Sequence, residues 1–199
     1  MLYLKKVKKQ KENLGIQDAG LEEILKAWEQ DSVLHKKALY KGYYGFLRGV
    51  IRRYVNDYHA TEELINDSFI KIFSNLHTFR GPGYSTNLQQ SFKSWVAKIA
   101  SRTAIDFLRK KKMDFLQEEP SENHFPDQHP AGVYTSEVKD IMALLDQLPE
   151  TQKTVFNLYE IEGFSHEEIS RLLNISENVC RVYLSRAKNK LKALYIKHF

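Results

Sequence analysis

Apolar residues recur along most of the chain at the spacing of an α-helix. Over residues 61–76, for example, Ile65, Phe69, Ile72 and Leu76 fall on one face of a helix with about 3.6 residues per turn. No stretch shows a convincing alternation of apolar and polar positions, the pattern of a half-buried strand. The sequence therefore predicts an all-α fold.

The expected helices form two groups separated by a polar stretch. The first group covers residues 21–28, 35–55, 61–76 and 92–112, and the second covers 137–147 and 149–163 with two further helices after residue 165. Residues 113–136 hold three prolines, five acidic residues and little apolar periodicity, which favours a flexible acidic linker. We therefore expect two small helical domains, 21–112 and 137–199, joined by a linker at 113–136 and preceded by a basic tail at 1–20.

The helices after residue 165 have the features of a helix-turn-helix. Ser165 and Glu168 form a capping box at the start of the first helix, and Ile169, Leu172 and Leu173 give it a short apolar face. Asn174 and Ile175 are expected to form the turn, and Ser176 to cap a longer helix. The expected buried stripe of that helix consists of Cys180, Leu184, Ala187 and Leu191.

The exposed side of this last helix is basic. In a helix-turn-helix the second helix enters the major groove, where residues near its start reach base edges and later cations meet phosphates. The predicted DNA-contacting residues are Asn178, Arg181, Val182, Ser185, Arg186 and Lys188. A helical hairpin with a solvated basic face is the alternative.

Composition narrows the possible chemistry. The net charge of +5 is concentrated in a lysine-rich start, the run at 109–112 and the last helix, which suggests a polyanionic partner. A single cysteine, Cys180, rules out an internal disulfide and a multi-cysteine zinc cluster, and the scattered histidines match no metal motif. We expect no metal, no cofactor and no catalytic residue in the chain.

No apolar run is long enough for a membrane span, and the start of the chain lacks the apolar stretch of a secretory signal. These features favour a cytoplasmic protein that does not bind membranes.

Three stretches resemble the sigma-70 family of RNA polymerase initiation factors. The stretch LPETQKTVFNLYEIEGFSHEEISRLLNISENVCRVYLSRAKNKL resembles region 4 of that family, whereas ATEELINDSFIKIFSNL and SFKSWVAKIASRTAIDFLRKKK resemble parts of region 2. Their order and the intervening linker are similar to the extracytoplasmic-function (ECF) group, which keeps only these two regions. The resemblance implies a sigma factor that binds core RNA polymerase and directs promoter recognition, DNA melting and initiation. Region 4 would bind the −35 element, and the contacts with polymerase would include the flap of the second-largest subunit.

The resemblance also implies two binding surfaces on the first domain, one for polymerase and one for DNA. Residues Glu63, Asn66, Asp67 and Ile70 share one face of the helix over 61–76, and in the family this helix grips the clamp helices of the largest polymerase subunit. A mixed acidic and apolar face suits a protein interface better than DNA, although a merely solvated face is the alternative.

The second surface belongs to the helix over 92–112 and the loop before it. In similar proteins this segment melts the −10 element and holds a flipped base. The residues expected to do so are Arg80, Tyr84, Trp95, Lys98, Arg102, Arg109 and Lys110. Trp95 also lies beside the expected core stripe of Phe92, Val96, Ile99, Thr103 and Phe107, so a core role is the alternative for it.

Two other functions are alternatives to a sigma factor. A conventional helix-turn-helix regulator that binds duplex DNA without polymerase would account for the second domain only. A nucleic-acid enzyme would need clustered carboxylates or a phosphate-binding loop, and no G-x-x-x-x-G-K-[ST] pattern occurs. In sigma factors of this group, an anti-sigma or other recruiting protein is a further possible partner.

Overall fold

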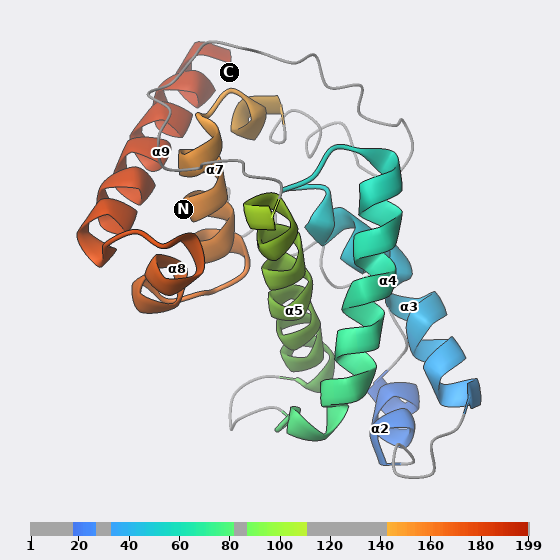
Figure 1. The fold of residues 1–199 in the computed structure, drawn as a ribbon. Helices are drawn as coiled ribbons and strands as arrows, with labels where there is room; N and C mark the ends of the chain where they lie inside the picture. Colours follow the sequence, from blue (N-terminus) through green and yellow to red (C-terminus); the bar gives the residue numbers. More distant parts are fainter. Residues whose placement is uncertain (1–17, 27–32, 82–86, 111–142, 199) are drawn as a thin grey trace. The chain divides into compact units, whose positions relative to one another are not determined.

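The computed structural model describes residues 18–26, 33–81, 87–110 and 143–198 (Figure 1). Every regular element among these residues is a helix, so the all-α prediction is confirmed. The chain separates into two compact units, Met1–Phe107 and Leu108–Phe199. The expected linker at 113–136, most of the expected tail at 1–20, and Tyr84 lie outside the described residues.

The first unit is built from the helices α2 (Asp18–Lys26), α3 (Val33–Ile51), α4 (Tyr58–Asn75) and α5 (Leu88–Lys110), with a 3-10 turn η3 (Leu76–Thr78) after α4. Helices α3 and α4 lie side by side (Figure 1). They run antiparallel, because Tyr44 of α3 contacts Glu62 whereas Tyr40 contacts Asn66.

The core of the first unit lies between α3, α4 and α5. The predicted inner face of α4 is confirmed, since Ile65, Phe69, Ile72 and Leu76 are all buried. Across from it, α3 and the first turns of α5 contribute Leu39, Tyr43, Leu47, Ile51, Phe92 and Val96. Burial of this apolar surface is the main contribution to the stability of the unit.

All four helices of the first unit begin earlier than the sequence predicted: α2 at Asp18 rather than residue 21, α3 at Val33 rather than residue 35, and α4 and α5 because two capping side chains were missed. Helix α4 begins at Tyr58 rather than at residue 61, since Asp57 accepts a 2.7 Å hydrogen bond from the amide of Ala60. Helix α5 begins at Leu88 rather than at residue 92, and Asn87 accepts in the same way from the amide of Gln90 at 2.7 Å.

The predicted end of α3 at residue 55 is also wrong, because the helix ends at Ile51. Residues 52–54 form a turn in which the amides of Arg53 and Tyr54 donate to carbonyls only three residues back. This tighter turn satisfies backbone groups at the end of α3 before α4, which Asp57 caps, begins.

The predicted inner stripe of α5 is correct in part. Phe92, Val96 and Thr103 are buried, but Ile99 and Phe107 are only half-buried. The buried face of α5 also includes three alanines, Ala97, Ala100 and Ala104, and the larger Ile105 and Leu108. The alanines let α5 approach its neighbours closely between the larger buried side chains.

The second unit contains helical residues 143–146, helix α7 (Glu150–Phe156), a π-helical turn η4 (Asn157–Ile161), and helices α8 (His166–Leu173) and α9 (Glu177–His198). The sequence predicted one helix over 149–163. In the structure Pro149 is the N-cap rather than the first helical residue, and the helix widens at η4, where the amide of Glu162 donates to the carbonyl of Asn157. The segment ends at Gly163, whose φ is +73°.

Candidate functional sites

The predicted capping box of α8 is present. The hydroxyl of Ser165 accepts from the amide of Glu168 at 3.1 Å, and the Glu168 carboxylate accepts from the amide of Ser165 at 2.9 Å. These two bonds satisfy backbone donors that the helix itself leaves open, so they fix where α8 begins.

The turn between α8 and α9 also agrees with the prediction. Asn174 adopts a left-handed conformation with φ 55° and ψ 45°, which ends α8. The hydroxyl of Ser176 then accepts from the amide of Val179 at 3.3 Å and caps α9. The helix-turn-helix expected from the sequence is therefore formed.

Helix α9 buries the expected stripe against the rest of the second unit. Cys180, Leu184 and Ala187 are buried, whereas Leu191 is half-buried. On α8, Ile169 and Leu173 are buried and Leu172 is half-buried. Cys180 is a core residue, and burial raises the pKa of its thiol.

The residues predicted to contact DNA are all exposed on α9. They are Asn178, Arg181, Val182, Ser185, Arg186 and Lys188. Arg181 forms an ion pair with Glu177 one turn earlier at 2.9 Å, and Val182 is an exposed apolar side chain among these polar neighbours. Lys188 differs from the others, because its ammonium lies 2.5 Å from the Glu160 carboxylate on η4.

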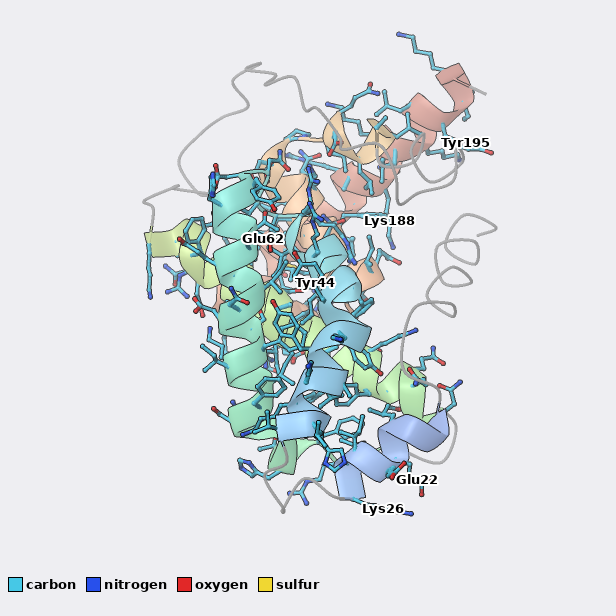
Figure 2. All side chains as sticks on the ribbon, turned by 90° about the vertical axis from the view of Figure 1, so that its right-hand side faces the viewer. Glu22, Lys26, Tyr44, Glu62, Lys188 and Tyr195 are labelled. Atoms are coloured by element: carbon cyan, nitrogen blue, oxygen red, sulfur yellow. The ribbon has the colours of Figure 1, made fainter. Side chains whose placement is uncertain are left out.

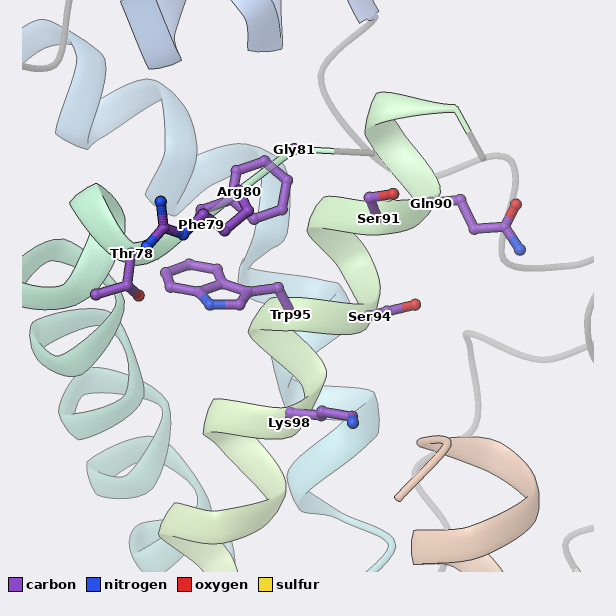
Figure 3. Close-up of a pocket in the computed structure, with 9 residues that line it drawn as sticks. All are labelled: Thr78, Phe79, Arg80, Gly81, Gln90, Ser91, Ser94, Trp95 and Lys98. Carbon is purple, nitrogen blue, oxygen red and sulfur yellow. The ribbon is translucent and has the colours of Figure 1, made fainter. Parts of the chain in front are cut away.

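The first unit has a hollow of about 460 Å³ between the end of α4 and the start of α5 (Figure 3). It brings together three of the residues predicted for −10 recognition: Arg80, Trp95 and Lys98. The remaining residues that line it are Thr78, Phe79, Gly81, Gln90, Ser91 and Ser94. Arg102, Arg109 and Lys110 do not line the hollow and lie exposed farther along α5.

One wall of the hollow is aromatic. The Trp95 ring lies 5.6 Å from Phe79 and 5.7 Å from Phe92, and the two phenylalanine rings lie 5.2 Å apart. Figure 3 shows the indole pointing from α5 toward Thr78 and Phe79. Trp95 is half-buried, so it both packs on the core and faces the hollow.

The sequence did not single out Phe79 or the polar residues Gln90, Ser91 and Ser94. They belong to the hollow only because the chain folds back between η3 and α5. The spacing of the aromatic residues within α5 predicts which side of the helix they share. It does not predict which residue of another element packs against that side.

The residues predicted to contact polymerase form an exposed face of α4, opposite its buried side. Glu63, Asn66, Asp67 and Ile70 are all exposed, and the Ile70 side chain remains 62% accessible. The Asn66 carbonyl oxygen accepts a 3.1 Å hydrogen bond from the hydroxyl of Tyr40. Two carboxylates and one large apolar side chain thus lie on the same accessible surface.

A cluster that the sequence did not predict joins α3 to α4 beside this face (Figure 2). The hydroxyl of Tyr44 donates to Glu62 at 2.6 Å, and the guanidinium of Arg48 lies 4.0 Å from the same carboxylate. Arg48 also lies over the ring of Tyr58, 5.7 Å from its centre. The hydrogen bond to Glu62, helped by burial, raises the pKa of Tyr44 to about 12.

The described residues contain no group of three or more side chains that could hold a metal ion. None of the helices in the described part of the chain is long and apolar enough to cross a membrane.

Two family models match the chain. The model described as sigma-70 region 2 matches residues 39–113, and the one described as sigma-70 region 4 matches residues 139–191. RNA polymerase sigma factor SigV of Bacillus subtilis is 31% identical over 143 residues, which cover 67% of this chain and 75% of SigV. The ECF RNA polymerase sigma factor SigM of the same organism is 25% identical over 141 residues, 70% of this chain and 82% of SigM.

The chain belongs to the sigma-70 family of RNA polymerase sigma factors, in its ECF group. It is therefore a DNA-binding factor that directs initiation by RNA polymerase at promoters. Among solved structures, the sigma factor RpoE in complex with the anti-sigma factor NepR, from Bartonella quintana, aligns with a TM-score of 0.47 and 22% identity, covering 76% of this chain and 90% of that one. The region 2 match of this sigma factor contains the hollow and the acidic face of α4, and the region 4 match contains the helix-turn-helix.

Proposed function

We propose that the two parts of this sigma factor divide the work of initiation. The part over 21–112 binds core RNA polymerase and opens the −10 element, the part over 137–199 binds the −35 duplex, and the segment 113–136 joins them. The observation that carries this proposal is the hollow beside α5, where cations and an aromatic wall meet within the region 2 match.

The hollow has the chemistry needed to hold a base that has left the stack. Aromatic rings such as Phe79 and Trp95 stack on any base, and such stacking contributes about 1–3 kcal/mol per base. The polar side chains of Gln90 and Ser94 supply donors and acceptors for the edge of the base.

Cations near the hollow are suited to the phosphates of the separated strand. Arg80 and Lys98 line it, and Arg102 is exposed one turn after Lys98 on α5. Arg109 and Lys110 extend the positive charge to the end of the helix. We include Tyr84 in this site on the basis of the sequence alone.

The exposed face of α4 supports binding to the clamp helices of the largest polymerase subunit. Glu63 and Asp67 give it negative charge, and Ile70 gives it an apolar centre that water solvates poorly. Charges of this kind speed association and select the partner, whereas the apolar contact contributes affinity.

On α9, the position of each residue along the helix supports a role at the −35 element. Asn178, Arg181 and Val182 lie in its first turns, where side chains reach base edges in the major groove. Ser185 and Arg186 follow one turn later and suit phosphate contacts. The flap of the second-largest subunit remains an expected contact of the sigma factor from the family resemblance.

Because the polymerase performs the bond-forming chemistry, we propose that this chain is not itself an enzyme and that it acts in the cytoplasm, where polymerase and promoter meet. A protein that inhibits or recruits the sigma factor, such as an anti-sigma protein, remains a prediction from the family resemblance.

Run-off transcription with core polymerase tests the proposal. The template is a promoter duplex recovered by the holoenzyme from a random-sequence library, and a second template carries the same sequence with its −10 region already unpaired. We expect Trp95→Ala to reduce transcription from the duplex and to retain most of it on the unpaired template, whereas Trp95→Phe keeps both. Equal loss on both templates would contradict a role of the hollow in opening, and sequence-specific DNA binding without core polymerase would favour a conventional regulator.

A further inference from the structure

The π-helical turn η4 directs two side chains toward the helix-turn-helix. In this turn the amide of Glu162 donates to the carbonyl of Asn157, five residues back, instead of four as in an α-helix. From this turn Tyr159 contacts α8 and Glu160 contacts α9. Turns of this kind are rare inside helices and occur often at functional sites.

Tyr159 stacks on the first residue of α8. Its ring lies 4.4 Å from the imidazole of His166 with an interplanar angle of 21°. The Nδ1 atom of His166 in turn lies 3.2 Å from the sulfur of Cys180 on α9. The Tyr159 ring of η4 is thus connected through His166 to Cys180 on the buried side of α9.

Glu160 reaches α9 directly. Its carboxylate is 2.5 Å from the ammonium of Lys188, and the Glu160 side chain is only 13% exposed. The same ammonium lies 5.9 Å from the centre of the Tyr159 ring. Because the Glu160 carboxylate is largely removed from water, its attraction to this cation is screened less than that of a fully exposed pair.

These contacts differ in kind from the rest of the packing of α9. The stripe of Cys180, Leu184 and Ala187 presents small or aliphatic side chains, whose contacts determine which side of α9 is buried but have no directional polar geometry. On α9, Lys188 instead forms an ion pair with Glu160 and lies over the Tyr159 ring, and both contacts weaken quickly when their geometry changes. These contacts therefore affect the orientation of α9 more than they affect whether α9 stays packed on the second unit.

We propose that Tyr159, Glu160, His166 and Lys188 form a clamp, the η4 clamp, that sets the angle at which α9 meets DNA. In this clamp Lys188 is a positioning residue that acts through Glu160, and it does not contact a phosphate. The inference rests on the proposed function, because it concerns the −35 contact made by the same helix. It gives Lys188 a different role from that of Arg181 and Arg186.

The salt dependence of promoter binding separates positioning from phosphate contact. Each lost phosphate contact lowers the slope of log K against log salt by about 0.9, whereas a misplaced helix lowers affinity with little change of slope. The probe is the promoter duplex recovered from a random-sequence library by the wild-type holoenzyme. For holoenzyme with Lys188→Met we expect roughly five- to tenfold weaker binding with an unchanged slope.

Lys197→Met is the matched control. Lys197 is an exposed lysine in the last turn of α9, eleven residues or about three turns after Arg186, and so lies beyond the residues expected to contact DNA. We expect this variant to bind the duplex as the wild type does. If Lys188→Met weakens binding and lowers the slope of log K against log salt by about 0.9, Lys188 contacts a phosphate and the proposal of the η4 clamp is contradicted.

Variants of Glu160 give an independent test on the same probe. Glu160→Gln leaves Lys188 in place, so it tightens DNA binding if Lys188 is a phosphate ligand that Glu160 restrains. The clamp predicts the reverse: Glu160→Gln weakens binding as much as Lys188→Met, the double variant is no weaker than either, and the exchange of Glu160→Lys with Lys188→Glu restores most of the loss.

Core polymerase binding and circular dichroism, measured for each variant, are expected to match the wild type, since the clamp orients α9 without being needed for the fold. A wild-type holoenzyme that selects no duplex contradicts the proposed function and the clamp with it. If the wild-type holoenzyme selects a duplex and the Glu160 and Lys188 variants bind it like Lys197→Met, the η4 clamp is contradicted and the proposed function is not.

Discussion

The hydroxyl of Tyr44 on α3 donates a 2.6 Å hydrogen bond to the carboxylate of Glu62 on α4. The bond crosses between two antiparallel helices next to the exposed face that holds Glu63 and Asp67. Since α3 and α4 together support that face, the bond helps to hold the acidic residues at a fixed spacing.

Removing this hydroxyl is expected to destabilise the first unit. Tyr44→Phe leaves a half-buried carboxylate without its donor, which costs about 1–2 kcal/mol of the free energy of unfolding. Guanidinium unfolding followed by tryptophan fluorescence measures it, because Trp95 packs in the first unit and the sequence has no tryptophan after it. Tyr58→Phe, which removes a hydroxyl from an exposed ring, is the control and is expected to change little.

The hydrogen bond between Tyr44 and Glu62 also predicts that the stability of the first unit falls at alkaline pH. The pKa of Tyr44 is raised to about 12 from an ordinary value of 10.0, so the stabilisation is complete below pH 10 and is lost as the pH rises toward 12. The wild type should therefore lose more stability over this range than Tyr44→Phe. Equal losses in the two proteins would show that the bond contributes nothing to folding.

His166 predicts a dependence on acidic pH in the second unit. Burial and the nearby Arg181 lower the pKa of His166, with Lys188 adding to the effect and Glu177 opposing it, so the neutral ring is preferred in the folded state. The stabilisation from this neutral ring is present above the ordinary value of 6.5 and is lost as the pH falls below it toward the lowered pKa.

Thermal unfolding followed by circular dichroism at pH 7.5 and 5.5 measures this effect. His166→Phe keeps a ring against Tyr159 but has no proton to bind, so its stability should fall less than that of the wild type on acidification. The other histidines and carboxylates contribute equally to both proteins. A fall of the same size in both would contradict the assignment to His166.

Arg181→Ala is expected to impair recognition of the −35 element without affecting polymerase binding. Loss of a side chain that contacts a base edge costs about 1–3 kcal/mol, or roughly 5- to 150-fold in affinity for the promoter. Arg171→Ala is a closely matched control, because Arg171 on α8 pairs with Glu167 at 2.9 Å as Arg181 pairs with Glu177 on α9. Equal losses for the two variants would mean that the ion pair, and not a DNA contact, explains the effect.

Periodicity predicted most of the fold because each core face lies on one helix. Ile65, Phe69 and Ile72 repeat at helical spacing and are all buried, and the capping box of Ser165 and Glu168 forms as its spacing indicates. The caps at Asp57 and Asn87 were present in the sequence and were overlooked. They would have given the correct starts of α4 and α5.

The remaining features depend on contacts between residues that are distant in the sequence. The hollow joins Arg80 to Trp95 across a loop, and Lys188 meets Glu160, which lies in the π-helical turn 28 residues earlier. No local pattern marks that turn, because its extra residue is accommodated by packing against other helices. For the same reason Lys188 resembles its exposed basic neighbours in the sequence and differs from them in the structure.

The affinity of the chain for core RNA polymerase, measured without DNA, tests most directly whether the face of α4 is the docking surface. We expect Glu63→Lys combined with Asp67→Lys to weaken binding about tenfold or more, because both carboxylates are exposed and their reversal opposes a complementary surface. Glu23→Lys, a reversal at an exposed site on α2, should leave the affinity unchanged. Wild-type affinity in the double variant, with its helical content intact, would contradict the account.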